Sequence, residues 1–299
     1  MNIKKVLKGT FLVVLALLVG AIFWQIKSEL PHSVNQPKKV VDDKKSKPAP
    51  VLEKTAEPAK SKKADSKSAK ADWLKSETPI EFPILMYHHI ADVVDGNTLF
   101  VPADEFEMEM MALKNAGYYT LTPEEAYRVL TTNEKPAEKI VWVTFDDGYK
   151  NAYDTAMPIL SRLEMTGSFF IITGMRDDED KMPDEMLLKM KQNSLISLES
   201  HTVNHPDLEY LTNDQADSEL RDSKQELDRL LKQKTSVICY PAGRYNNETA
   251  ELAENAGYKL GLTTNPGLAS SRNGLFALNR VRVAYGHSEA TFMALIGDK

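Results

Sequence analysis

From about residue 80 onward, short apolar runs alternate with longer segments whose apolar residues recur at helical spacing. The short runs are rich in β-branched and aromatic residues, which is typical of buried strands. We predict strands at residues 83–87, 118–121, 140–145, 168–172, 195–198, 236–239, 258–263 and 278–283. We predict helices at residues 103–116, 149–163, 184–192, 213–231 and 248–256, and another that begins at Pro123. This alternation predicts a parallel sheet with helices outside it.

The number of predicted strands narrows the fold class. Seven or eight strands in one α/β domain favour a (β/α) barrel, closed or incomplete, over an open sheet. A Rossmann domain or a P-loop would need a glycine-rich turn between a strand and a helix, and the sequence contains none. Local signals also mark helix ends: Thr122, Pro123 and Glu125 predict a capping box, and Gly257 ends the helix before it.

The N-terminal residues predict a membrane segment. Three lysines within residues 1–8 precede an uncharged run over residues 9–26, which at roughly 27 Å could cross the hydrocarbon part of a membrane. We expect residues 1–8 to stay in the cytoplasm and residues 9–26 to be an uncleaved transmembrane signal-anchor, because no small-residue cleavage site follows. A cleaved signal peptide is the alternative, and it would release the protein.

A linker is expected between this segment and a folded domain. Residues 27–75 are rich in Lys, Pro, Ala and Ser, which predicts disorder, and the domain should then span residues 76–299. Residues 1–30 carry four Lys and one Glu, a net charge of +3, and residues 31–75 carry twelve Lys and six acids, a net charge of +6. Because the whole chain has a net charge of −6, the domain must carry −15. A domain this acidic argues against a nucleic-acid partner. The single cysteine, Cys239, excludes an internal disulfide framework.

Two adjacent carboxylates, Asp146 and Asp147, follow the predicted strand at residues 140–145 and precede Gly148. Asp and Gly are poor strand formers, so the carboxylates should lie at the C-terminal end of the strand, where α/β folds place their active sites. One carboxylate could then face a metal and the other a substrate. The alternative is a pair of carboxylates that caps the following helix.

Histidines also gather at predicted strand ends. His88 and His89 follow the first predicted strand, and His201 and His205 lie four residues apart after the fifth. Two histidines and one carboxylate are a common ligand set for a catalytic divalent metal. The alternative for His201 and His205 alone is a pair of surface histidines. Combined with the Asp-Asp pair at the same edge, their spacing predicts a metal site.

Two motifs carry a family resemblance. Residues 144–149 (Thr-Phe-Asp-Asp-Gly-Tyr) and 201–206 (His-Thr-Val-Asn-His-Pro) resemble motifs of the polysaccharide deacetylase family, also called the NodB-homology or carbohydrate esterase family 4 domain. The resemblance covers about residues 80–285. It implies a distorted or incomplete (β/α) barrel of the NodB-homology type. It also implies an enzyme that removes acetyl groups from glycans with a divalent metal.

The resemblance also implies roles for four side chains. Asp146 would be the general base. Asp147, His201 and His205 would be the metal ligands, with Zn²⁺ as the usual ion. The chemistry agrees, because amide hydrolysis needs a polarised carbonyl and a nucleophile stronger than water, and a divalent ion supplies both. A neighbouring carboxylate can take the proton of the water.

A third motif matches the family only in part. Residues 239–246 (Cys-Tyr-Pro-Ala-Gly-Arg-Tyr-Asn) resemble its Pro-aromatic-Gly loop, but Ala242 stands at the aromatic position. Many members have an arginine that orients the base at the position of Cys239. We expect Arg244 or Arg280 to hold Asp146 instead. The weaker candidates for substrate binding or orientation are Tyr149, Tyr240, Pro241, Gly243, Arg244, Tyr245 and Arg280.

The general acid is harder to assign, because the late motifs of the family are absent. Residues 85–89 (Leu-Met-Tyr-His-His) resemble the start of the exopolysaccharide and cell-surface poly-N-acetylglucosamine deacetylase branch, in which the histidine after the tyrosine lies near the active site. We therefore predict that His88 protonates the leaving amine, with His89 as the second choice. A histidine packed in the core is the alternative.

The sequence thus predicts a metal-dependent deacetylase of N-acetylglucosamine-type residues in a cell-wall or cell-surface polysaccharide. An O-acetyl esterase acting on xylan-like polymers would use the same site. A catalytically weak glycan-binding domain is the third hypothesis, because the arginine and the late motifs differ from the family. The expected location is the cell membrane, with a single span and the domain outside the cell. The expected partners are the glycan and the membrane, and no protein partner can be inferred.

Overall fold

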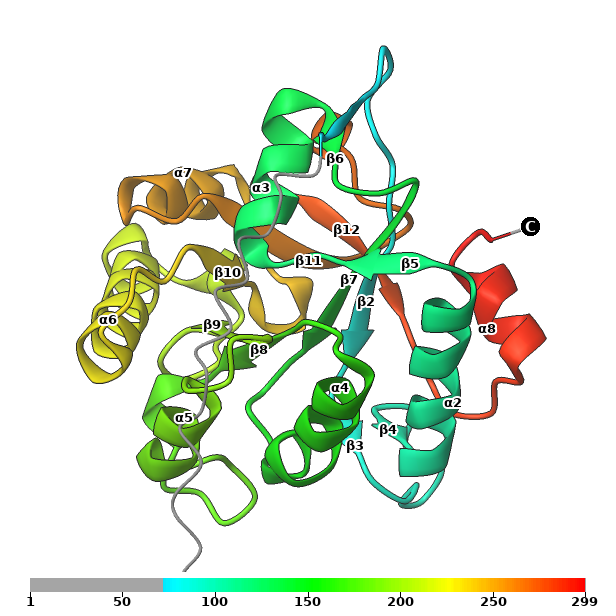
Figure 1. Cartoon of the computed structure of the whole chain (residues 1–299). Helices are drawn as coiled ribbons and strands as arrows, with labels where there is room; N and C mark the ends of the chain where they lie inside the picture. The colour runs from blue at the N-terminus through cyan, green and yellow to red at the C-terminus, as the bar shows by residue number, and fades with distance from the viewer. Residues whose placement is uncertain (1–71, 299) are drawn as a thin grey trace, which may run out of the picture. The chain divides into compact units, whose positions relative to one another are not determined.

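A closed ring of parallel strands forms the centre of residues 72–298, the part of the chain that the computed structural model describes (Figure 1). In ring order the strands are β2 (Ile84–Tyr87), β12 (Leu278–Arg282), β11 (Leu260–Pro266), β10 (Val237–Cys239), β9 (Ile196–Ser200), β8 (Gly167–Ile171) and β7 (Lys139–Phe145). The pairing of β7 with β2 closes the ring. An eighth strand, β5 (Tyr118–Thr120), pairs with the first residues of β7 and stays outside the ring. The predicted barrel is therefore a seven-stranded parallel barrel.

Side-chain alternation along β7 separates the inside of the barrel from the outside. Val141 and Phe145 pack in one apolar cluster, and Trp142 packs in another. Thr144 lies on the same side of the strand as Trp142, and it accepts a hydrogen bond from Arg280 of β12. Because β2 lies between β7 and β12 in the ring, this contact crosses the barrel interior. Even-numbered residues of β7 therefore point inward, and this direction leads to Asp146.

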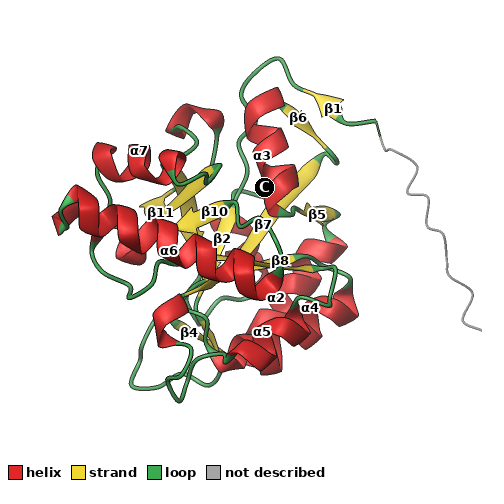
Figure 2. Cartoon of the chain, turned by 90° about the vertical axis from the view of Figure 1, so that its left-hand side faces the viewer, coloured by secondary structure: helices red, strands yellow, loops and turns green. Residues whose placement is uncertain are grey.

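Helices cover the outside of the barrel (Figures 1 and 2). They are α2 (Ala103–Asn115), α3 (Pro123–Thr132), α4 (Met157–Leu163), α5 (Asp184–Met190), α6 (Asn213–Leu231), α7 (Asn247–Asn255) and α8 (Glu289–Leu295). Two short strand pairs lie outside the barrel: β1 (Leu74–Lys75) with β6 (Glu134–Lys135), and β3 (His89–Ile90) with β4 (Phe100–Val101). These pairs and α8 are absent from the elements predicted from the sequence, because two-residue strands and short helices leave almost no periodic signal.

The predicted helix ends and strand ends can be compared with the structure. The capping box at Thr122 is confirmed, and Gly257 follows α7 with a φ of 90°. The helix predicted at residues 149–163 is confirmed from residue 150 onward, with a π-helical segment over Ala152–Ala156 before α4. Only Tyr149 lies outside it, because this residue forms a β-bridge with Lys181. The predicted strand at residues 195–198 continues to Ser200 in β9.

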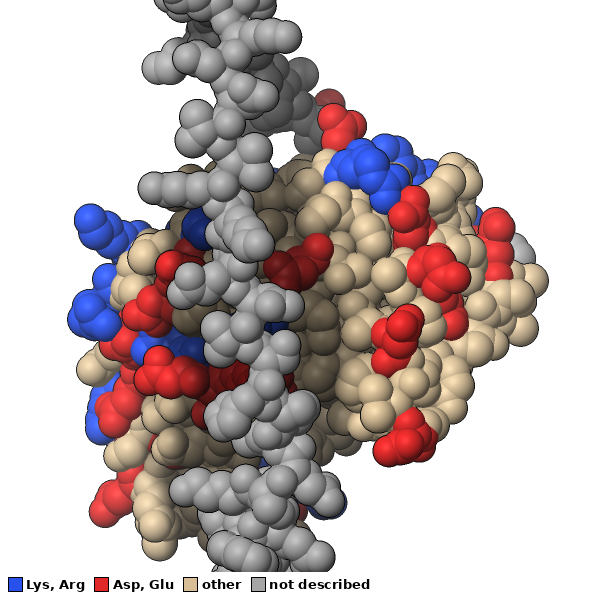
Figure 3. All heavy atoms as spheres, turned by 90° about the horizontal axis from the view of Figure 1, so that it is seen from below, with Lys and Arg blue, Asp and Glu red and all other residues tan. Residues whose placement is uncertain are grey.

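The predicted signal-anchor and most of the predicted linker lie outside the described residues. Within residues 72–298, no helix is both long enough and apolar enough for a membrane crossing. Acidic side chains are spread over the face of the domain that Figure 3 shows, and Lys and Arg side chains gather at its left and upper edges.

Candidate active site

The predicted catalytic and metal-binding residues lie at the C-terminal ends of the barrel strands. His88 follows β2, Asp146 and Asp147 follow β7, and His201 follows β9. Parallel strands bring these ends to the same edge of the barrel, so residues far apart in sequence meet there.

A possible metal-ligand set surrounds Asp147. Its Oδ1 lies 3.2 Å from Nε2 of His201 and 3.3 Å from Nε2 of His205, and one ligand atom from each of the three residues fits within 4.8 Å. Nδ1 of His201 is 2.7 Å from the carbonyl oxygen of Cys239, which leaves Nε2 free to face Asp147. Burial alone would raise the pKa of Asp147, but hydrogen bonds from His201 and His205 outweigh it and hold this pKa far below its usual range. Two imidazoles and a carboxylate suit Zn²⁺ or a similar divalent ion.

Of the eight non-glycine residues with positive φ among residues 72–298, four lie in the motif loops. Asp147, Thr202, His205 and Ala242 all have φ values between 50° and 69°. Such left-handed conformations cost about 1–2 kcal/mol for a residue with a Cβ, and they persist where the surroundings hold them. Each of the three motif loops contains at least one such residue, which indicates that these loops have a functional role in addition to connecting strands.

Arg280 holds the neighbouring carboxylate. Its two terminal nitrogens lie 2.8 Å from Oδ1 and 2.7 Å from Oδ2 of Asp146, and its Nε donates to the carbonyl of Thr263 at 2.7 Å. Arg280 is wholly buried, and Asp146 is 3% exposed. Burial raises the pKa of Asp146, but the charge of Arg280 and its hydrogen bonds lower it to about 2. Asp146 is therefore ionised at neutral pH, as a general base must be.

A second possible ligand set shares His201 with the first. It consists of Asp146, His201 and Cys239, which also bring one ligand atom each within 4.8 Å of one another. The guanidinium of Arg280 contacts both Asp146 and the Cys239 sulfur, the latter at 3.1 Å, so a cation there would meet a fixed positive charge. Burial also raises the pKa of the Cys239 thiol, which disfavours the thiolate that binds metals.

The two adjacent histidines differ in their surroundings. Nε2 of His88 lies 3.9 Å from Oδ2 of Asp146, and its side chain is 11% exposed. Burial lowers the pKa of His88. His89 is stacked between the rings of Phe100 and Tyr149, and burial followed by the charge of Lys181 lowers its pKa to about 4. The structure thus brings His88, and not His89, next to Asp146.

The weaker candidates for substrate binding or orientation lie partly in the core and partly at the surface. Tyr240 is fully buried and stacks on Tyr245 at 4.8 Å between ring centroids. Pro241 is buried, and Gly243 has a φ of 69° with Thr264 so close that a side chain would collide with it. Arg244 faces Glu209 at 3.5 Å and does not contact Asp146.

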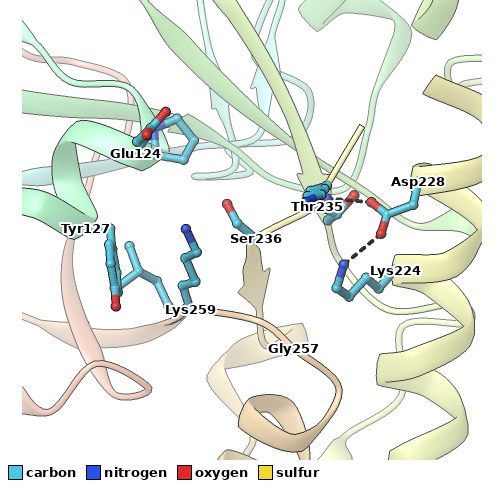
Figure 4. A pocket seen from close by; sticks show the side chains of 11 residues that line it. Glu124, Tyr127, Lys224, Asp228, Thr235, Ser236, Gly257 and Lys259 are labelled. Carbon is cyan, nitrogen blue, oxygen red and sulfur yellow. Dashed lines mark hydrogen bonds and ion pairs between the residues drawn. The ribbon is translucent and has the colours of Figure 1, made fainter. Parts of the chain in front are cut away.

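A separate cavity lies at the other end of the barrel. It has a volume of about 530 Å³ and lies between α3 and α6 (Figure 4), next to residues that precede β10 and β11. Tyr127, Lys224 and Lys259 are among its lining residues, and none of the predicted site residues lines it.

Comparison with known proteins identifies the family. A family model described as "Polysaccharide deacetylase" matches residues 133–261. YxkH of Bacillus subtilis (strain 168), whose name places it among the polysaccharide deacetylases, is 46% identical over 235 residues, which are 79% of this chain and 82% of YxkH. The chain belongs to the polysaccharide deacetylase family. This assignment confirms the resemblance seen in the two motifs.

Two further comparisons extend the family assignment. The structure of the Streptococcus pyogenes deacetylase PplD in complex with acetate aligns with a TM-score of 0.71 and 41% identity, covering 73% of this chain and 99% of PplD. The poly-β-1,6-N-acetyl-D-glucosamine N-deacetylase of Staphylococcus aureus is 27% identical over 179 residues, which are 54% of this chain and 60% of that enzyme. A polysaccharide substrate is thus implied for this deacetylase.

Proposed function

We propose that the domain removes N-acetyl groups from N-acetylglucosamine-type residues of a cell-wall or cell-surface polysaccharide. The observation that carries this proposal is the convergence of Asp147, His201 and His205 beside a carboxylate that Arg280 holds in place. The relative that is a poly-N-acetylglucosamine N-deacetylase supports the choice of an N-acetyl substrate.

Asp147, His201 and His205 would hold a divalent metal, for which we propose Zn²⁺. When bound, such an ion polarises the acetyl carbonyl and makes water a stronger nucleophile. The contact of His201 with the carbonyl of Cys239 fixes the orientation of its ring, and the hydrogen bond from the backbone of His205 to the Thr202 hydroxyl, at 3.0 Å, fixes the loop.

Asp146 and His88 would move the protons. The ionised Asp146 takes a proton from the attacking water, and its bidentate contact with Arg280 keeps both oxygens oriented. The oxygen of the water then bonds to the acetyl carbon, the C–N bond breaks, and acetate and an amine form. His88, 3.9 Å from Asp146, receives the proton that Asp146 took from the water and donates it to the leaving nitrogen, which returns both groups to their starting states.

We place the enzyme in the cell membrane, anchored by residues 9–26 with the domain outside the cell, on the sequence of the first 75 residues alone. Membrane fractionation tests this placement: the full chain should stay in the membrane pellet at high salt, and a chain that lacks residues 1–26 should not.

Acetate release tests the activity. Purified protein loaded with zinc should release acetate from N-acetylglucosamine oligomers faster than from acetylated xylan. Chelation should abolish this release and added zinc should restore it, whereas Asp146→Asn should remain inactive with zinc present. Faster release from xylan would favour the O-acetyl esterase, and binding of oligomers without any hydrolysis would favour the glycan-binding domain.

A further inference from the structure

The metal ligand Asp147 lies in a backbone conformation that needs external support. Its φ is 69°, and Gly148 follows with 68°. Glycine adopts this region freely, but a residue with a Cβ relaxes out of it unless its neighbours hold it. The contacts around residues 148–150 show where this support comes from.

Residues 148–150 pair with a loop that lies outside all three motifs. The amide of Lys150 donates a hydrogen bond to the carbonyl oxygen of Asp180 at 2.8 Å. The amide of Met182 donates one to the carbonyl oxygen of Gly148 at 2.9 Å. Tyr149 and Lys181 are the bridge partners between these two bonds. The segment after Asp147 is thus tied to residues 180–182 along its backbone.

Side chains from four places in the chain form a stack at this point. The Lys181 ammonium lies 3.4 Å from the centroid of the Tyr149 ring. The other face of Tyr149 covers His89 at 3.4 Å between centroids, and His89 in turn stacks on Phe100 at 4.1 Å and 5°. Both faces of Tyr149 are therefore covered, so this ring has no free face for stacking on a sugar.

Lys181 has no role in the proposed proton transfers, yet it is only 8% exposed. Within residues 72–298, no carboxylate forms an ion pair with it at 4.0 Å or less. Burying an unpaired ammonium is costly unless other groups stabilise it. Here the Tyr149 ring face does so, together with the charges of Asp147 and Asp180.

We propose that the stack of Lys181, Tyr149, His89 and Phe100 positions Asp147 for metal binding. The ring of Tyr149, two residues after Asp147, is clamped between His89 and Lys181, which come from two other segments of the chain. The stack thereby holds residues 147–149 in the strained conformation that turns Asp147 toward His201 and His205. Lys181 and Tyr149 are thus positioning residues, and this inference rests on the proposed metal site.

Metal affinity tests the stack directly, without any substrate. Lys181→Met removes the charge and keeps the length, and Tyr149→Leu removes the ring. In competition with a chelator, each variant of the full chain should bind zinc about 10- to 100-fold more weakly than the wild type, which is the usual effect of losing a group that orients a ligand. Lys181→Arg, which keeps a cation over the ring, should bind within about threefold of the wild type. Tyr149→Phe keeps the ring and should also bind within about threefold of the wild type, and Lys181→Met carries the test if Tyr149→Leu does not fold.

A second lysine–tyrosine pair provides the matched control. The Lys259 ammonium lies 5.0 Å from the centroid of the Tyr127 ring, in the cavity at the opposite end of the barrel (Figure 4). Lys259→Met and Tyr127→Leu should leave zinc affinity unchanged. Wild-type zinc affinity in folded Lys181→Met and Tyr149→Leu would overturn the role of the stack but not the deacetylase. A wild-type protein that binds no divalent metal would overturn both proposals.

Discussion

At the scale of residues, Arg280 holds the Asp146 carboxylate, and Cys239 leaves the space that Arg280 occupies. The guanidinium of Arg280 contacts both oxygens of Asp146 and also the sulfur of Cys239. An arginine at position 239 would compete with Arg280 for the same space and would add a second buried positive charge. The small thiol leaves this space to Arg280, so an arginine from β12 keeps the carboxylate ionised and oriented.

Removing this arginine should change the pH dependence of the reaction. Arg280→Met leaves Asp146 buried without its cation, so the pKa of Asp146 should rise from about 2. The acid limb of the profile of kcat/KM against pH should move to higher pH, and kcat/KM at pH 7 should fall roughly 100-fold. Arg280→Lys keeps the charge and loses the bidentate contact, so its kcat/KM at pH 7 should lie between the values of the wild type and Arg280→Met.

The control for Arg280 is an arginine in an exposed ion pair. Arg272 contacts Glu81 at 3.1 Å with its side chain 62% exposed, and Arg272→Gln should leave the profile unchanged. An unshifted acid limb in folded Arg280→Met would contradict the assigned role of the arginine.

His88→Ala should distinguish a proton donor from a structural histidine. An amine needs a proton to leave, whereas the phenolate of an aryl acetate does not. Loss of His88 should therefore slow N-deacetylation by about 100-fold or more and slow aryl acetate hydrolysis far less. Rates on both substrates, with zinc affinity measured on the same samples, check this expectation. Equal losses on the two substrates would mean that His88 supports the site without donating the proton.

At the scale of elements, a buried acid connects α2 to β2. The Tyr87 hydroxyl donates to Oε2 of Glu109 at 2.7 Å, and Glu109 is fully buried. Burial raises the pKa of Glu109 to about 8. The acid is thus mostly protonated at neutral pH inside the fold, whereas an unfolded chain would hold it ionised. This contact positions β2 directly before His88.

The raised pKa of Glu109 makes stability depend on pH. The folded value lies above the unfolded value, so the stabilising contribution is complete below about pH 4.5 and is lost as the pH rises to about 8. Glu109→Gln removes the ionisable group and keeps an acceptor for Tyr87. The free energy of unfolding of the wild type, relative to this variant, should therefore fall by a few kcal/mol between pH 5 and pH 9. Urea unfolding at both pH values measures it, and a constant difference would mean that Glu109 ionises without penalty in the fold.

At the scale of the whole molecule, closure of the barrel joins the proposed metal ligands to the rest of the structure. Asp147 follows β7 and His201 follows β9, with β8 between them in the ring. A metal bound to both would link two segments that are separated by more than 50 residues of chain. Metal binding should therefore stabilise the domain as a unit.

Thermal unfolding measures this linkage. At a free zinc concentration 100 times the dissociation constant, binding should add about 2.7 kcal/mol, which for a domain of this size corresponds to a rise in Tm of roughly 5–10 °C. His205→Ala should lose most of this rise, and the Arg272→Gln control should keep it. A Tm that does not respond to zinc in the wild type would contradict a metal site between these strands.

Much of this arrangement could be predicted from the sequence. Local periodicity determined the order of strands and helices, and the Asp146-Asp147 pair with His201 and His205 indicated a shared edge. This inference works because the C-terminal ends of parallel strands lie together whatever the details of the barrel. The capping box at Thr122 was predictable for a similar reason, since it depends only on residues three apart.

Only the tertiary structure decided the remaining features. Apolar alternation tells which side of a strand faces inward, but it does not tell which strands face each other across a barrel. Arg244 and Arg280 were therefore equal candidates for holding Asp146. The contact of Arg280 with Asp146 spans 134 residues of chain. Lys181 and Phe100 lie outside every motif, and only their contacts in the tertiary structure, with Tyr149 and His89, indicate a role for them. The number of strands in the barrel was open for the same reason, because closure depends on the pairing of β7 with β2, far apart in the chain.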